Sequence, residues 1–260
     1  MMSELVLYEL KAPAALITLN RADKRNALSR DLIAAIQSAF ARAKDDPSAR
    51  CVLLHHAGPT FCAGMDLAEL RESIEAQTAG GNVWNDALAL ANVYDLIYTL
   101  PKPTIAMVGG AAVAGGAGLV TVCDLAIATP EAKFGYPEVR RGLVAAMVMP
   151  HLLRHVGERM ARHLLLTGQL IDAQAALASG LINEVVPAAR LLDRGMELVR
   201  ACAEGGPQAL SATKALLHRF SQQAASVVEA AQSSAAPRLS EECRQGLAAF
   251  FEKRPAPWVK

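Results

Sequence analysis

The chain has 260 residues, of which 52% are hydrophobic and 20% charged, and its formal net charge is +1. The length allows one large domain or two small ones, and the composition is that of a globular protein. A net charge so close to zero argues against nucleic acid or an anionic membrane as the main partner. The first ten residues lack the regions of a signal peptide, and the five cysteines are scattered without a metal-binding pair. We therefore expect a cytoplasmic protein with reduced thiols and no metal.

Expected strands and helices alternate through the first two thirds of the chain. Continuous apolar runs or strict alternation predict strands, and apolar spacings of three and four residues predict helices. The strands are expected at 6–10, 15–20, 51–56, 105–108 and 125–128, and the helices at 29–44, 66–73 and 87–100. After Glu138 the pattern is mostly helical, and its last two expected helices, at 227–236 and 240–251, are alanine-rich. This order predicts an α/β core followed by a helical region. Residues 74–86, of mixed polarity, are expected to form a mobile segment over a site.

The stretch from Lys102 to Asp124 has 21 uncharged residues between its ends. We interpret it as a strand, a glycine turn and a helix that begins near Gly115. Such a turn leaves backbone N–H groups free at a helix start, where negative charge is favoured, and glycine permits a close approach of a ligand. The stretch is long enough to span a membrane, but its five glycines make it weakly hydrophobic. The glycines match no nucleotide-binding loop, so an oxyanion or phosphate site remains.

A second turn of the same kind follows Phe61, in the sequence FCAGMDL, where Asp66 is expected to cap a helix. Two such turns can each direct one N–H at a shared carbonyl oxygen and form an oxyanion hole, in which each donor contributes roughly 3–4 kcal/mol. The sequence alone leaves open whether the two turns converge.

Glu138 follows an aromatic stretch and is surrounded in sequence by apolar residues. A desolvated carboxyl group has a raised pKa, which suits a group that takes up and returns a proton. The alternative is a salt bridge to Arg140 or Arg141.

Six segments resemble those of the crotonase family, the enoyl-CoA hydratases and isomerases, in order and in spacing. They are LNRADKRNALS, FCAGMDL, the stretch 109–124, FGYPE with RRGL, LTGQLIDAQAALASGLINEVVP and FFEKRPAPW. The resemblance runs from about Leu16 to Trp258. It implies an α/β fold with a crotonase-like ββα spiral core at 1–200, and a C-terminal helical region at 201–260 that packs a trimer or a dimer of trimers. It also implies an acyl-CoA thioester substrate, so that coenzyme A enters as part of the substrate and no separate cofactor is expected.

The resemblance assigns roles to individual residues. It implies that the N–H groups of Ala63 and Gly115 are the oxyanion donors and that Glu138 is the catalytic acid and base. The contacts implied with the CoA and thioester are Lys24, Arg25, Ala63, Gly64, Met65, Asp66, Gly115 and Gly116. For Lys24 and Arg25, solvated surface charge is an equally good interpretation.

The chain departs from the family's two-glutamate pattern, because Gly118 stands where the other glutamate is expected. One carboxylate is enough to shift a double bond, whereas two hold the water for hydration best. However, the segment after Glu138 resembles a bacterial branch that hydrates branched glutaconyl-type CoA esters without that glutamate. We therefore predict an enoyl-CoA hydratase, with a Δ3,Δ2-enoyl-CoA isomerase and a catalytically silent acyl-CoA binder as alternatives. A serine hydrolase is disfavoured, because neither glycine turn carries a serine.

Overall fold

The computed structural model describes residues 4–75, 80–221 and 227–257. Its main sheet has six strands in the order β1-β2-β3-β5-β7-β10. The first two form an antiparallel hairpin, and the other neighbouring strands run parallel. Their bounds are β1 Val6–Lys11, β2 Ala14–Leu19, β3 Cys51–His56, β5 Thr104–Val108, β7 Leu125–Ala128 and β10 Glu184–Val185.

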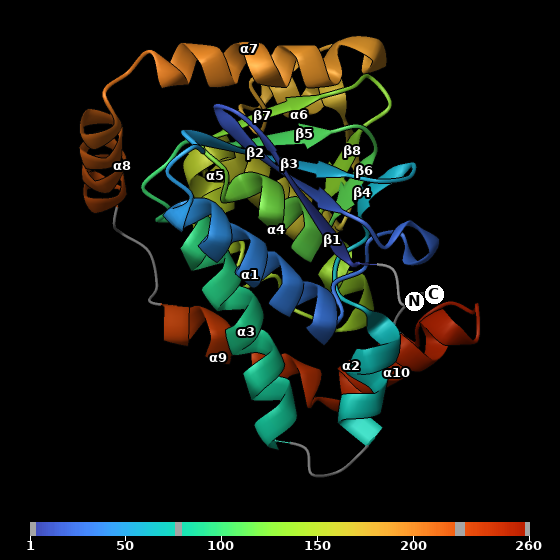
Figure 1. The fold of residues 1–260 in the computed structure, drawn as a ribbon. Coiled ribbons are helices and arrows are strands. Elements are labelled where there is room, and N and C mark those ends of the chain that lie inside the picture. The colour runs from blue at the N-terminus through green and yellow to red at the C-terminus, as the bar shows by residue number, and fades with distance from the viewer. Residues whose placement is uncertain (1–3, 76–79, 222–226, 258–260) are drawn as a thin grey trace.

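Helices cover both faces of the central strands of this sheet, which explains why those strands are apolar almost without interruption. Leu54 and its neighbours on one face share a core with α1 (Arg30–Asp45) and α3 (Gly80–Tyr98). Leu53 and its neighbours on the other face pack under α7 (Leu191–Ala203), which crosses the top of the molecule in Figure 1. Alternate residues of one strand thus belong to two separate cores.

A second, smaller sheet carries the glycine turns. Its order is β4-β6-β8-β9, with bounds Thr60–Cys62, Ala111–Val113, Lys133–Gly135 and Ile171–Asp172. The prediction of one glycine turn directly between strand and helix was incomplete, because β6 lies between the two glycine pairs of that stretch. The chain passes from β5 of the main sheet to β6 of the smaller sheet at Gly110. Only glycine fits there, because a Cβ would lie 2.0 Å from the Pro59 carbonyl oxygen. Helix α4 (Gly115–Thr121) begins only after β6.

Most predicted helices are confirmed. Ser29 caps α1 by accepting a hydrogen bond from the N–H of Leu32. Helix α5 (Met149–Thr167) is broken at Gly157, where φ is +68°. The remaining helices are α2 Leu67–Glu75, α6 Ala173–Ala178, α8 Pro207–Phe220, α9 Val227–Arg238 and α10 Glu241–Phe251, with 3₁₀ helices η1 Ala22–Lys24, η2 Pro137–Arg141 and η3 Ala188–Arg190.

The expected mobile segment 74–86 falls partly outside the described residues, and its part from residue 80 onward is the first turns of α3. In the part of the chain that the structure describes, no helix is long and apolar enough to cross a membrane. The uncharged stretch 103–123 instead forms two short strands and a short helix, and most of its residues are buried.

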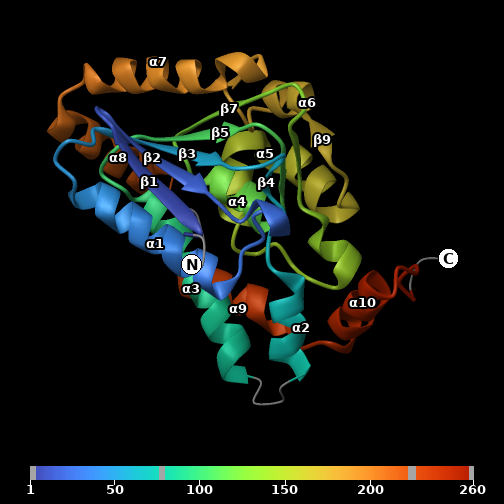
Figure 2. The ribbon, with the colours of Figure 1, turned by 45° about the vertical axis from the view of Figure 1, so that its right-hand side comes forward.

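The last two helices fold back onto the core rather than extending away from it (Figure 2). Helix α9 packs against α3 in an apolar cluster, and α10 packs against α2 in another. Through this packing, residues of α9 and α10 line the same cavity as residues of the smaller sheet. A boundary at residue 200 stays a prediction.

Candidate active site

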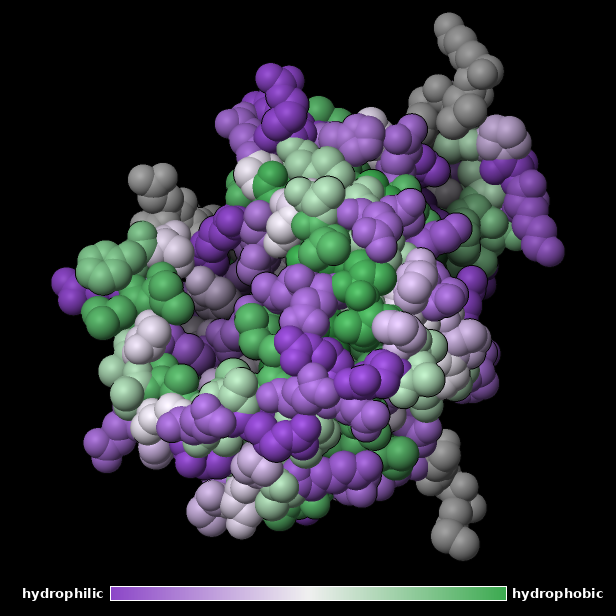
Figure 3. Space-filling model, turned by 90° about the horizontal axis from the view of Figure 1, so that it is seen from above, coloured by the Kyte–Doolittle hydropathy of each residue, from purple (hydrophilic) through white to green (hydrophobic). Residues whose placement is uncertain are grey.

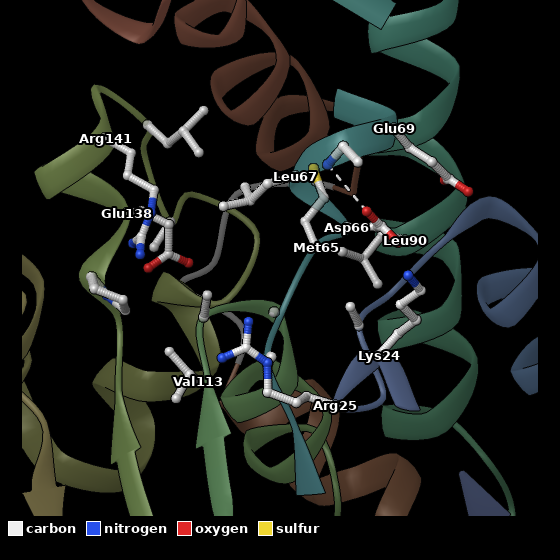
Figure 4. A pocket seen from close by; sticks show the side chains of 18 of the residues that line it. Lys24, Arg25, Met65, Asp66, Leu67, Glu69, Leu90, Val113, Glu138 and Arg141 are labelled. Atoms are coloured by element: carbon white, nitrogen blue, oxygen red, sulfur yellow. Dashed lines mark hydrogen bonds between the residues drawn. The ribbon is translucent and has the colours of Figure 1, made fainter. Parts of the chain in front are cut away.

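A cavity of about 780 Å³ lies between the smaller sheet and the helices that pack against it. Its walls come from the loop around η1, the β4–α2 and β6–α4 turns, α3, η2 and both C-terminal helices. Figure 4 shows the carboxylate of Glu138 on one side of this space and Met65 on the other. The structure thus brings together the two turns and the carboxylate that the sequence singled out.

The two glycine turns are in direct contact. A Cβ on Gly64 would lie 3.3 Å from the nitrogen of Gly115 and 2.8 Å from the Cβ of Ala114. A Cβ on Gly116 would lie 2.3 Å from the Cys62 carbonyl oxygen. Neither Gly64 nor Gly116 lines the cavity. Their lack of a side chain instead allows the two turns to pack closely against each other.

The structure corrects one of the two predicted oxyanion donors. The N–H of Ala63 donates to the carbonyl of Arg25 at 3.0 Å, so it is already used. Met65 forms a parallel β-bridge with Leu28. In this bridge the N–H of Leu28 donates to the carbonyl of Gly64, and the N–H of Asp66 donates to the carbonyl of Leu28. The N–H of Met65 therefore points away from Leu28. Within the described ranges, nothing accepts a hydrogen bond from it or from the N–H of Gly115, and both residues line the cavity.

Ala114, directly before Gly115, has a strained backbone. Its φ is +52° and its ψ is −126°, a conformation that side-chain-bearing residues rarely adopt. Strain of this kind is maintained only where the surrounding packing holds it. Here it sets the direction of the following N–H, that of Gly115.

A tyrosine occupies the space beside Gly118. A Cβ there would lie 2.4 Å from the hydroxyl oxygen of Tyr94 and 2.5 Å from Cγ1 of Val148. Tyr94 is only 2% exposed, and its hydroxyl donates to the carbonyl of Gly115 at 2.7 Å. Position 118 therefore has no room for a second glutamate while Tyr94 holds this place. Sequence reasoning missed Tyr94, because nothing local connects α3 with the turn at Gly115.

Glu138 is half-buried, with its Oε2 atom shielded from solvent, and it forms no ion pair within 4.0 Å among the described residues. It lies in η2, and its Oε2 atom has no hydrogen-bond partner. Burial raises the pKa of Glu138 from 4.5 to about 7, and the positive charges of Arg141 and Arg238 only partly oppose this. The predicted alternative of a salt bridge is not found: Arg140 donates instead to the Thr167 carbonyl, and Arg141 makes no ion pair within 4.0 Å in the described structure.

The predicted CoA contacts are partly at the cavity. Lys24, Arg25 and Asp66 line it, and in Figure 4 the two basic side chains extend from the side opposite Arg141. The carboxylate of Asp66 pairs with Arg21 at 2.7 Å. Burial acts to raise the pKa of Asp66, but the hydrogen bonds from Arg21 and the N–H of Ala68 outweigh it and lower the pKa. Asp66 thus fixes the β4–α2 turn.

Comparison with known proteins identifies the family. The family model for enoyl-CoA hydratase/isomerase matches residues 9–260. The chain belongs to the enoyl-CoA hydratase/isomerase family. A Thermus thermophilus protein named "Putative enoyl-CoA hydratase" is 40% identical over 247 residues, which are 94% of this chain and 97% of that protein.

Solved structures confirm the crotonase-like fold. The crystal structure of an enoyl-CoA hydratase from Mycobacterium avium matches with a TM-score of 0.83 and 35% identity, over 99% of this chain and 100% of that one. A methylmalonyl-CoA decarboxylase in complex with 2-nitronate-propionyl-CoA matches with a TM-score of 0.86 and 28% identity, over 98% of each chain. These relatives have different reactions in their names, so the family membership alone does not specify the reaction.

Proposed function

We propose that this family member is an enoyl-CoA hydratase that adds water to a 2-enoyl-CoA thioester. One observation carries the proposal: a solvent-shielded, unpaired carboxylate, that of Glu138, faces the two free N–H donors of Met65 and Gly115 across one cavity. Two such donors stabilise the negative charge that develops on the thioester oxygen. A carboxyl group with a pKa of about 7 is present in both protonation states near neutral pH, as acid–base catalysis requires.

The proposed reaction needs only one carboxylate. Glu138 takes a proton from water as the water oxygen bonds to C3, and the electrons of the double bond move to the thioester oxygen. The N–H groups of Met65 and Gly115 hold this enolate. When the enolate collapses, Glu138 returns the proton to C2, so that the product has gained the elements of water. The basic side chains of Lys24 and Arg25 are proposed to hold the CoA phosphates.

Isomerisation is the second candidate, because the described cavity holds no carboxylate at position 118. The space that a second glutamate needs there is filled by Tyr94. In this alternative Glu138 removes a proton from C2 of a 3-enoyl-CoA and returns it at C4, while the same two N–H groups stabilise the enolate.

The test is proton NMR of the products formed in D₂O from 2-enoyl and 3-enoyl CoA esters, both straight and branched. A 3-hydroxyacyl product supports hydration, and a migrated double bond without added oxygen supports isomerisation. Binding of every ester without turnover of any would favour a silent acyl-CoA binder and contradict the proposal.

Replacing Glu138 by glutamine is expected to lower kcat by about 10²–10⁴-fold while CoA-ester binding is kept, because the proton carrier is lost and the shape is retained. The control is Glu158→Gln, which changes an exposed glutamate paired with Arg162 on α5. Full activity of Glu138→Gln would contradict the assignment.

We also propose a homotrimer or a dimer of trimers. Figure 3 shows hydrophobic side chains gathered at the left edge, where α8 lies in Figure 1. Helix α8 exposes Leu216, Leu217 and Phe220, of which Phe220 is 83% exposed. Exposed apolar faces of this kind mark subunit contacts. Light scattering coupled to size-exclusion chromatography measures the assembly, and a monomer at micromolar concentration would contradict it.

A further inference from the structure

The carbonyl of Gly115 accepts a hydrogen bond from a side chain of another helix. The hydroxyl of Tyr94, on α3, donates to it at 2.7 Å. Tyr94 is buried and forms part of the cavity wall. Burial raises the pKa of this hydroxyl well above its ordinary value, so the group keeps its proton and remains a donor at neutral pH. Tyr94 thus anchors the residue whose N–H is a proposed oxyanion donor.

The N–H of Gly115 is the free group in an otherwise fully bonded piece of backbone. The N–H of Ala114 donates to the carbonyl of Gly135 at 2.8 Å, and the carbonyl of Ala114 accepts from the N–H of Gly118 at 3.0 Å. Together with the bond from Tyr94, these contacts leave only the N–H of Gly115 unpaired among the backbone groups of residues 114 and 115 in the described structure. The first two bonds join backbone groups, whereas the third depends on one side chain.

This anchor matters because the backbone directly before Gly115 is strained. The positive φ of Ala114 persists only where the surroundings hold it. Gly115 itself has no Cβ that would restrict its dihedral angles. Without the bond from Tyr94, rotation about Gly115 can release part of the strain and turn its N–H. A hydrogen bond weakens steeply as the angle at its hydrogen falls toward about 120°, so such a rotation weakens the stabilisation of an enolate oxygen.

Gly118 makes the anchor possible. A Cβ at position 118 would lie 2.4 Å from the hydroxyl oxygen of Tyr94, so a side chain there would displace this hydroxyl from the carbonyl of Gly115. A Cβ on Gly115 would lie 3.1 Å from the same hydroxyl oxygen. The hydroxyl therefore fits between two positions that both lack a side chain.

We infer that Tyr94 is a positioning residue for the oxyanion hole. Its hydroxyl bond to the carbonyl of Gly115 directs the N–H of that residue at the thioester oxygen, and Gly118 provides the room for the hydroxyl. This inference rests on the proposed function, since it assumes that the N–H of Gly115 stabilises an enolate. It applies to hydration and to isomerisation alike, because both reactions pass through that enolate.

The test compares Tyr94→Phe with the unmodified protein by infrared difference spectroscopy of bound butyryl-CoA, labelled with ¹³C at the thioester carbonyl. This saturated ester cannot be hydrated, and hydrogen bonds to its carbonyl oxygen lower the frequency of the carbonyl band. The unmodified protein is expected to lower the frequency, and Tyr94→Phe is expected to lower it less. The matched control is Tyr98→Phe, one turn further along α3, which loses a hydroxyl bonded to that of Ser221 at 3.1 Å outside the cavity lining and should keep the full shift.

Turnover gives a second measurement, made with the enoyl-CoA ester that the NMR test finds to react. Removal of a whole oxyanion donor lowers kcat by about 10²–10³-fold, so a misdirected donor in Tyr94→Phe is expected to lower it by about 10–100-fold. The affinity for butyryl-CoA is expected to change much less than kcat, because most contacts with the ester are kept. A variant that is merely loosened would not combine a smaller band shift, a lower kcat and a retained affinity.

The outcomes separate the two proposals. If the unmodified protein does not lower the frequency of the carbonyl band, the two N–H groups form no oxyanion hole, and both proposals are overturned. An equal shift or an unchanged kcat in Tyr94→Phe overturns the inference and leaves the proposed function standing. The same loss of shift in Tyr98→Phe also overturns it. If Tyr94→Phe does not fold, Gly118→Ala takes its place, because its Cβ displaces the same hydroxyl, and the same smaller shift is expected.

Discussion

Replacing Glu138 by glutamine is expected to stabilise the fold near neutral pH, although it removes activity. Burial raises the pKa of Glu138 from 4.5 to about 7, so between these pH values the folded protein holds a proton that the unfolded chain has released. The free energy of unfolding of the unmodified protein therefore falls as the pH rises through this window. Each pH unit corresponds to 1.36 kcal/mol, which sets the full effect at about 3 kcal/mol. Glutamine does not ionise, so the free energy of unfolding of the variant does not show this decrease with pH.

Part of the gain is offset, because the positive charges of Arg141 and Arg238 lose a nearby negative one in the variant. We expect a net stabilisation of about 1–3 kcal/mol at pH 8, which shrinks toward zero at pH 5. Urea unfolding at pH 5, 6, 7 and 8 measures it, with Glu158→Gln, which removes an exposed carboxylate, as the control. A variant that is no more stable than the unmodified protein at pH 8 would refute the desolvation of Glu138 on which the acid–base role depends.

Two further substitutions test the packing of the turns. Gly118→Ala is expected to destabilise the fold by about 1–3 kcal/mol in urea unfolding, because its Cβ would lie 2.4 Å from the Tyr94 hydroxyl. In the double variant with Tyr94→Leu, part of this lost stability should be recovered. Strictly additive effects of the two substitutions would contradict the clash. Ala114→Gly is expected to relieve strain of about 1–3 kcal/mol and raise Tm, with kcat nearly unchanged. The neutral control is Gly206→Ala at an exposed position, where the added Cβ meets nothing closer than 3.8 Å. A lower Tm for Ala114→Gly would show that the strain is absent.

Local patterns were sufficient to predict most of the elements. The apolar run of β3 and the apolar spacing of α1 each depend on residues close together in the sequence. The smaller sheet was largely missed, because β4, β6 and β8 have three residues each and β9 has two. Strands that short show no periodicity to detect.

The motifs that resemble the family predicted Glu138 and Gly115, which both line the cavity, but they placed the first donor on Ala63. Two contacts decide which N–H of that turn is free. The carbonyl of Arg25 accepts a hydrogen bond from the Ala63 N–H, and the bridge between Leu28 and Met65 turns the Met65 N–H away from Leu28. Both contacts join segments far apart in the chain, so the turn sequence by itself could not reveal them.

The sequence by itself determined which residues are apolar, which glycines permit tight turns and which carboxylate lies in an apolar stretch. Only the tertiary structure decided that Tyr94 fills the space beside Gly118 and that Arg238, from the last part of the chain, faces the same cavity as Glu138. The physical reason is that hydrophobic patterning and turn chemistry are local, whereas the loss of water from a charged group depends on everything that packs around it.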